Sequence, residues 1–159
     1  MGKLLVVNLH GLINVPTGTR ETLIQLGIGK RFAAAIVEDE PVAKGSVRLC
    51  KDYVAWAALD SDLLTDLLKT RGKVSSSKIL DDEALKALGF ETHAALAKKL
   101  MEPGVARLSS VKGKDVHLRP FFALSPPKGG FKRSSRRQFR EGGILGDNPQ
   151  LATIVRRML

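Results

Sequence analysis

The chain has 159 residues, of which 43% are hydrophobic, which suits one domain or one domain with an extension. Its formal net charge of +10 favours a polyanionic partner. A single cysteine, Cys50, excludes an internal disulfide framework and fits a reducing cytosol, and we expect neither a membrane span nor a signal peptide.

The first seventy residues alternate between strand and helix patterns. Three strands rich in Leu, Val or Ala are predicted at 3–9, 31–38 and 53–59. Three helices follow them in turn, at 16–26, 41–50 and 61–71. Pro41 suits the first turn of the second helix, and leucines give the third an apolar face. This βαβαβα order indicates an α/β core domain over residues 1–71, with one small sheet and a helical layer.

Residues 72–159 form a predicted extension. Two short helices are expected, one ending at Gly89 and one that Thr92 caps. A last helix has Asn148 as its cap and an apolar face at i, i+3, i+4 and i+7, namely Leu151, Ile154, Val155 and Met158. Because this face must pack on the domain, the loop before it is expected to be tethered at both ends.

Almost all of the excess charge lies in this basic loop, residues 107–143. Residues 107–140 contain ten Lys or Arg and one acid, and the rest of the chain is nearly neutral. Within the loop, a basic segment at 125–143 reads SPPKGGFKRSSRRQFREGG and has neither a helical nor a strand period. Burying its two phenylalanine side chains would stabilise the segment by less than the conformational entropy that ordering its backbone costs. We therefore expect a polyanion to give this segment its shape, with a solvated, mobile loop as the alternative.

RNA is the polyanion that the composition favours. The glycine pairs of the basic segment, at 129–130 and 142–143, allow positive φ and let backbone N–H groups approach phosphates. The planar side chains of its Phe and Arg residues can stack on unpaired bases. A glycine with flanking cations in the second helix is a weaker signal of the same kind. The candidate RNA-binding residues are Arg119, Lys128, Gly129, Gly130, Phe131, Lys132, Arg133, Arg136, Arg137, Arg140, Gly142, Gly143, Lys44, Gly45 and Arg48.

No catalytic residue, metal site or cofactor is expected. His10, His93 and His117 are scattered without metal-ligand spacing, and the acidic run 81–83 begins a helix, where it favours the macrodipole. If the chain binds RNA, it can do so as a structural component of a ribonucleoprotein, and two other kinds of function remain open at this point. One is a small enzyme acting on RNA through these histidines, and the other is a free RNA-binding regulator.

Six stretches in one order carry a family resemblance. They are YVAW at 53–56, LLKTRGKV at 67–74, LRPF at 118–121, SPPKGGFK at 125–132, EGG at 141–143 and IVRRM at 154–158. Together they resemble the archaeal and eukaryotic family of large-subunit ribosomal proteins called L thirty (L seven in eukaryotes), over nearly the whole chain. Archaeal relatives usually have an aromatic–Arg–Gly motif in the second helix, and Ala43-Lys44-Gly45 keeps its glycine and its charge.

The resemblance implies an α/β (α+β) fold: a small three-stranded antiparallel sheet with helices on one face, related to ferredoxin-like folds, plus a helical and loop-rich C-terminal extension. It also implies a structural, non-enzymatic constituent of the large (50S) ribosomal subunit, located on the ribosome in the cytoplasm. The implied partners are 23S-type ribosomal RNA, 5S ribosomal RNA as a second candidate contact, and other large-subunit proteins. No membrane is implied.

Overall fold

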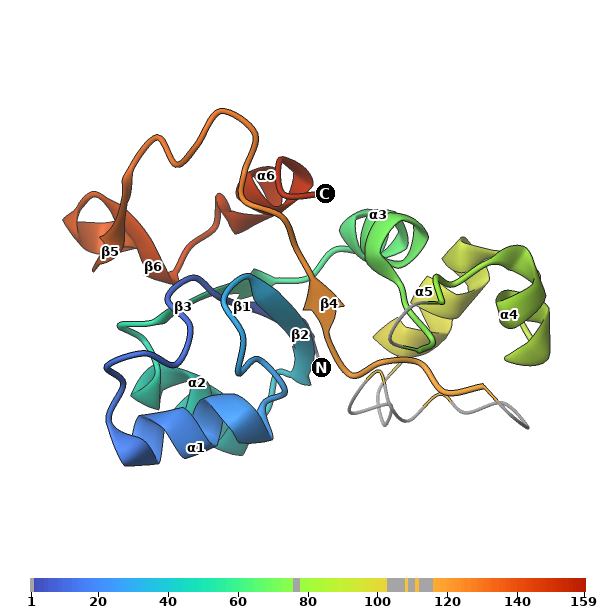
Figure 1. The fold of residues 1–159 in the computed structure, drawn as a ribbon, viewed down its shortest axis with the longest axis horizontal. Helices are drawn as coiled ribbons and strands as arrows, with labels where there is room; N and C mark the ends of the chain where they lie inside the picture. The colour runs from blue at the N-terminus through green and yellow to red at the C-terminus, as the bar shows by residue number, and fades with distance from the viewer. Residues whose placement is uncertain (1, 76–77, 103–107, 109–110, 112–115) are drawn as a thin grey trace.

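The structure, a computed structural model, describes residues 2–75, 78–102, 108, 111 and 116–159. Its elements, shown in Figure 1, are β1 (Lys3–Asn8), α1 (Thr17–Gln25), β2 (Ala33–Glu38), α2 (Pro41–Leu49), β3 (Val54–Ala58), α3 (Ser61–Arg71), α4 (Asp82–Ala87), α5 (His93–Met101), β4 (Phe122–Ala123), β5 (Ser134–Gln138), the 3-10 helix η2 (Phe139–Glu141), β6 (Gly143–Asp147) and α6 (Leu151–Arg156). All nine strands and helices predicted from the sequence are present. No helix in the described part is long and apolar enough to cross a bilayer.

The sheet is mixed and larger than expected. β1 lies between β2 and β3 and pairs with both in antiparallel fashion, which confirms the three predicted strands. The described residues extend this sheet to six strands in the order β4-β2-β1-β3-β6-β5, so the expectation of only three is wrong. β4 has two residues and β6 reads GILGD, patterns too short to predict from periodicity. Such strands are stabilised by pairing with strands already in place.

Helices cover both faces of the sheet, and the expected single helical layer is therefore wrong. Leu23 of α1 and Val47 of α2 share one cluster of buried side chains with Val6. The other face, with Leu5, packs in a second cluster with α3 and α6 (Figure 1). The physical reason lies in β1, since all six of its residues are buried and its run LLVV is apolar on both sides.

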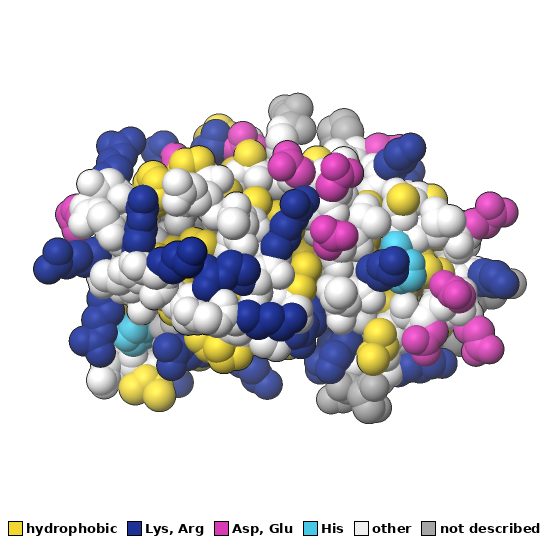
Figure 2. All heavy atoms as spheres, turned by 90° about the horizontal axis from the view of Figure 1, so that it is seen from above, with side chains coloured by type: hydrophobic (Ala, Val, Ile, Leu, Met, Phe, Trp, Pro, Cys, Tyr) yellow, Lys and Arg dark blue, Asp and Glu magenta, His cyan; other side chains and the backbone are white. Residues whose placement is uncertain are grey.

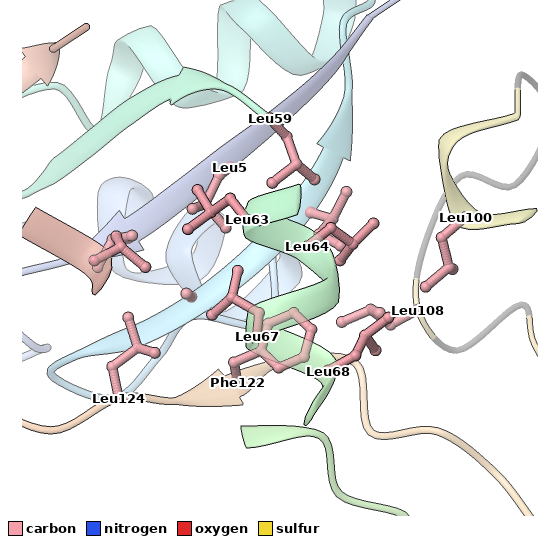
Figure 3. Close-up of a cluster of buried hydrophobic side chains, with 14 of the residues drawn as sticks. Leu5, Leu59, Leu63, Leu64, Leu67, Leu68, Leu100, Leu108, Phe122 and Leu124 are labelled. Atoms are coloured by element: carbon pink, nitrogen blue, oxygen red, sulfur yellow. The ribbon is translucent and has the colours of Figure 1, made fainter. Parts of the chain in front are cut away.

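Helix α3 is the centre of the larger cluster. Its leucines at 63, 64, 67 and 68 are all buried, and Figure 3 shows them directed to both sides of the helix. Leu63 lies beside Leu5 of the sheet, while Leu68 points toward Leu100 and Leu108. Helix α3 therefore joins the sheet to the α4–α5 part of the extension.

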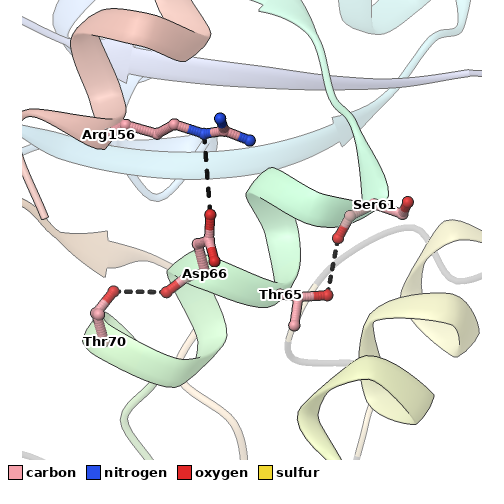
Figure 4. A network of polar contacts seen from close by, with 5 residues as sticks. All are labelled: Ser61, Thr65, Asp66, Thr70 and Arg156. Atoms are coloured by element: carbon pink, nitrogen blue, oxygen red, sulfur yellow. Dashed lines mark hydrogen bonds and ion pairs between the residues drawn. The ribbon is translucent and has the colours of Figure 1, made fainter.

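Helix α3 also holds the chain on either side of the basic segment. At its last residue, one guanidinium nitrogen of Arg71 (Nη2) donates to the Leu159 carbonyl oxygen at 2.6 Å and to the Ser125 hydroxyl at 2.5 Å. One turn earlier, Asp66 lies 3.8 Å from Arg156 of α6 (Figure 4). The Ser125 N–H donates to the Met158 carbonyl at 3.0 Å. The basic segment is thus tethered at both ends, as expected.

Candidate nucleic-acid interface

The glycine pair at 129–130 forms a turn that the chain itself holds. Gly129 and Gly130 have φ of 77° and 70°, and the Gly130 N–H donates to the Pro127 carbonyl at 2.9 Å. Just after α6, the Arg157 guanidinium donates to the carbonyls of Lys128 and Gly130, at 2.6 Å in each case. This part of the segment therefore has intramolecular contacts that define its shape, whereas we had expected that shape to come from a partner.

The rest of the segment has regular structure that its sequence pattern does not indicate. β5 pairs with β6 in an irregular register, and Gly142, with φ of 81°, ends the 3-10 turn between them. The guanidinium of Arg133 lies 5.3 Å from the centre of the Phe139 ring. The Gln138 side-chain amide donates to Asp52 at 3.0 Å, which ties the segment to the turn before β3. β5 reads SSRRQ, so its pairing with β6, and not an apolar pattern, makes it a strand.

Gly143 is a glycine because the backbone of β5 passes close to it. A Cβ at this position would overlap the carbonyl oxygen of Arg137, so the two strands would have to shift to accommodate it. Around Gly130 and Gly142, by contrast, no atom of the described residues other than the immediate chain neighbours lies within 4 Å of an added Cβ. Positive φ is what favours glycine at those two positions, whereas close packing within the chain requires it at Gly143.

Gly143→Ala is expected to destabilise the protein by about 1–3 kcal/mol, because the added methyl forces β5 and β6 apart. Gly45→Ala is the matched control, since an added Cβ there meets no atom within 4 Å in the part of the chain that the structure describes, apart from the backbone of its own helix. In the interior of α2 that exchange is expected to stabilise the helix by roughly 1 kcal/mol. Urea unfolding of both variants without RNA measures the two values. If the Gly143→Ala and Gly45→Ala variants had the same free energy of unfolding, the close contact between β5 and β6 at Gly143 would not be as described.

Six cations along the basic segment are exposed. They are Lys128, Lys132, Arg133, Arg136, Arg137 and Arg140. Among the residues described, none of these six forms an ion pair with a carboxylate; the ion pairs found lie elsewhere. Figure 2 shows Lys and Arg side chains crowded over the half of the molecule that carries this segment, and most Asp and Glu side chains in that view over the other half. The charge is therefore concentrated and available to an external anion.

Arg119 does not join this group. It lies three residues before β4, and β4 and β5 are the opposite edges of the sheet. Its guanidinium lies 5.3 Å from the ring centre of Phe121, and its backbone N–H donates to the backbone carbonyl of Lys73. Phe131 of the segment is half-buried, and its ring centre lies 6.2 Å from that of Phe32. It is therefore less available to stack on an RNA base than the sequence suggests.

Helix α2 brings a second group of cations to the same end of the sheet. Lys44 and Arg48 of α2 and Lys51, two residues after its end, line a hollow of about 460 Å³. Phe139 and Arg140 of η2 line the same hollow, which we call the α2–η2 hollow. The cause is topological, because α2 leads into β3, η2 leads into β6, and β3 and β6 are parallel neighbours. The two groups of cations predicted separately thus meet at one place.

The surroundings of Lys44 and Gly45 bear on the prediction that α2 contacts RNA phosphates. The ammonium of Lys44 lies 2.6 Å from a carboxylate oxygen of Asp39, and both side chains are partly exposed. Such a pair contributes little to stability, and a phosphate can compete for the lysine. Gly45 has open space around it, so no contact within the chain requires a glycine there. Close approach by an external group therefore remains a prediction.

Lys51 and Trp56 also line the hollow and were not among the predicted site residues. Lys51 continues the spacing of Lys44 and Arg48 by one turn, a periodicity that the sequence contains. Trp56 stands among alanines in β3 and is half-buried. A large aromatic side chain flanked by small ones in a strand was the available signal, but only the pairing of β3 with β6 shows that it borders a basic hollow.

Two of the three histidines make packing or backbone contacts within the chain. The ring of His10 packs edge-on against Tyr53 at 5.2 Å, and the Nε2 of His93 lies 3.3 Å from the Leu80 carbonyl oxygen. In the part of the chain that the structure describes, no three His, Cys, Asp or Glu side chains are grouped so as to hold a metal. Burial raises the pKa of the Cys50 thiol to about 11, so it stays protonated at neutral pH and is a poor nucleophile or ligand.

Gly130→Val and Arg136→Ala should weaken RNA binding in different ways. The valine places a β-branched side chain at a φ of 70°, so its cost is conformational and nearly independent of salt. The alanine removes one cation, so its cost shrinks as salt rises and the salt slope falls by about one unit at most. Affinity for an RNA fragment at two salt concentrations distinguishes them. Parental binding by Gly130→Val would mean that this turn acts only as a spacer.

A mixed sheet flanked by helices, with a dense group of exposed cations at one end, is typical of a small nucleic-acid-binding protein. Comparison with known proteins is more specific. Residues 4–54 match the family model described as ribosomal protein L30p/L7e. Proteins called large ribosomal subunit protein uL30 are similar over nearly the full length of both chains. The relative from Nitrosopumilus maritimus is 38% identical over 155 residues, covering 98% of this chain and 97% of its own.

Two further archaeal relatives agree. The uL30 proteins of Cenarchaeum symbiosum and Methanothrix thermoacetophila are 33% and 31% identical, with 99% and 96% of this chain covered and 99% and 97% of their own. The chain therefore belongs to the L30p/L7e family of ribosomal proteins, as the sequence motifs indicated.

Proposed function

We propose that this chain is a structural, non-enzymatic constituent of the large ribosomal subunit and that its basic end binds and stabilises large-subunit ribosomal RNA. The family supports the ribosomal, non-enzymatic role and a cytoplasmic location. One observation supports the choice of interface: the exposed cations of the basic segment and those of α2 lie at one end of the sheet. Phosphates that neutralise such cations release condensed counterions, which favours binding.

The RNA partner is 23S-type ribosomal RNA, with 5S ribosomal RNA as a second candidate contact. Acidic side chains are more numerous over the α4–α5 half in Figure 2 than over the basic end, and they repel phosphates, so we place that half away from the RNA. It is then free to contact other large-subunit proteins. Of the predicted RNA-binding residues, the six cations of the segment, the turn glycines, Lys44, Gly45 and Arg48 form this interface. Arg119 makes a separate contact from the opposite edge of the sheet.

The chain is divided into a core over residues 1–71 and an extension over 72–159. Strands β1 to β3 pair with one another without the extension, whereas β4 and β6 add to β2 and β3. The extension contributes α4, α5, the basic segment and α6. In this division the core positions α2, and the extension supplies most of the charge.

Association with ribosomes in high salt tests the structural role. Because a subunit constituent has many cooperative contacts, we expect a fixed stoichiometry with large subunits pelleted through a high-salt cushion. A free RNA-binding regulator would be lost from the pellet at moderate salt, and that result would overturn the proposal. The regulator is the alternative that this experiment separates.

A further inference from the structure

The α2–η2 hollow has one charged side and one aromatic side. The cations Lys44, Arg48 and Arg140 border it from α2 and from η2. Trp56 and Asp147 are register partners in β3 and β6, so they lie side by side at its base. Its volume of about 460 Å³ falls within the range of roughly 300–1,000 Å³ typical of small-ligand sites.

The arrangement of charge distinguishes the two ends of any anionic ligand. A phosphate is attracted to the cations of α2 and η2 and repelled by the carboxylate of Asp147. Asp39 also lines the hollow and pairs with Lys44. Arg48 and Arg140 are cations there without a carboxylate partner among the ion pairs of the described residues. The indole ring of Trp56 is half-buried against the smaller core cluster and also borders the hollow. An aromatic ring stacks favourably on the π-face of any nucleic-acid base. One side of the hollow therefore suits a phosphate and the other suits a base.

We propose that the α2–η2 hollow binds a single unstacked nucleotide of the RNA, with its base against Trp56 and its phosphate among Lys44, Arg48 and Arg140. This inference rests on the proposed function and names the ligand of one site within it. A duplex is too wide for a hollow of this volume, whereas a nucleotide turned out of a loop or bulge is not. Single-stranded loops and bulges are also where RNA bases are free to stack on protein side chains.

The fluorescence of Trp56 reports on this site directly, because the chain has only one tryptophan. The full-length protein is titrated with purified large-subunit ribosomal RNA, while a filter assay measures binding independently. We expect Trp56 fluorescence to be quenched in step with binding, and acrylamide to lose access to the ring in the complex. Binding without any change at Trp56 would overturn this inference and leave the proposed function intact. Failure to bind the RNA at all would overturn both.

Variants separate stacking from charge. Trp56→Leu is expected to reduce RNA affinity about five- to a hundredfold, the effect of losing one base–aromatic stack, without changing the salt slope. Trp56→Phe keeps an aromatic face and should recover part of that affinity. Phe90→Leu is the matched control, since Phe90 is half-buried just after α4, at the other end of the molecule, and should bind like the parent.

Two results from these experiments would contradict the inference. If Trp56→Leu and Phe90→Leu weakened RNA binding equally, the loss would reflect a general change in the fold. If Trp56 became protected only when other large-subunit proteins were added, the hollow would be a protein-docking site. Should Trp56→Leu fail to fold, the fluorescence titration of the parent protein still decides between the outcomes.

Discussion

Replacing the six cations of the basic segment with glutamine will reduce RNA affinity on the order of a thousandfold at low salt. The replaced residues are Lys128, Lys132, Arg133, Arg136, Arg137 and Arg140. Each phosphate contact contributes about −0.7 to −0.9 to the slope of log K against log salt. Six contacts therefore account for a slope of roughly −4 to −5, and the variant should lose that part of it. Filter binding to an RNA fragment over a salt series measures both quantities.

The control for this experiment neutralises cations at the opposite end. Lys69, Lys86, Lys98 and Lys99 are exposed on α3, α4 and α5, and their replacement by glutamine should leave the slope almost unchanged. An RNA fragment is the right ligand, because whole subunits add cooperative contacts. If the control flattened the slope and the sixfold variant did not, the interface would lie on the α4–α5 half.

Leu67→Ala is expected to lower the free energy of unfolding by about 2–5 kcal/mol. The Leu67 side chain is 0% exposed and lies beside Phe122 of β4, as Figure 3 shows. Removing this side chain leaves a cavity. Helix α3 cannot close it without moving relative to the sheet or to the α4–α5 part of the extension, since the helix packs on both. Leu49→Ala is the matched control, because Leu49 is 59% exposed at the end of α2 and should change stability by less than about 0.5 kcal/mol.

Urea unfolding without RNA measures both leucine variants. Since Arg71 at the end of α3 also binds the chain on both sides of the basic segment, Leu67→Ala should weaken RNA binding as well. A large loss of stability with unchanged RNA affinity would show that the segment keeps its shape independently of α3.

The sequence was sufficient where local patterns decide the structure. The run LLVV in β1, Pro41 at the start of α2 and Thr92 as the cap of α5 all mark elements that the structure contains. The Thr92 hydroxyl accepts a hydrogen bond from the Ala95 N–H at 3.2 Å, as a cap does. The charge distribution likewise located the basic segment, because a count of cations needs no tertiary information.

What the sequence could not predict depends on contacts between distant residues. β6 is a strand because it lies beside β3, about ninety residues earlier, and that pairing alone places η2 opposite α2. The need for glycine at Gly143 comes from the carbonyl of Arg137 and not from a phosphate. The βαβαβα order and the family resemblance both led us to expect helices on one face only, although β1 is apolar on both sides.

Ultraviolet cross-linking of intact large subunits, followed by identification of the cross-linked peptides, tests the interface most directly. It uses the protein in its assembled state and needs no variant. The account predicts RNA adducts on peptides from residues 128–140 and on the peptide that contains Trp56. Adducts confined to residues 82–101, on α4 and α5, would contradict it.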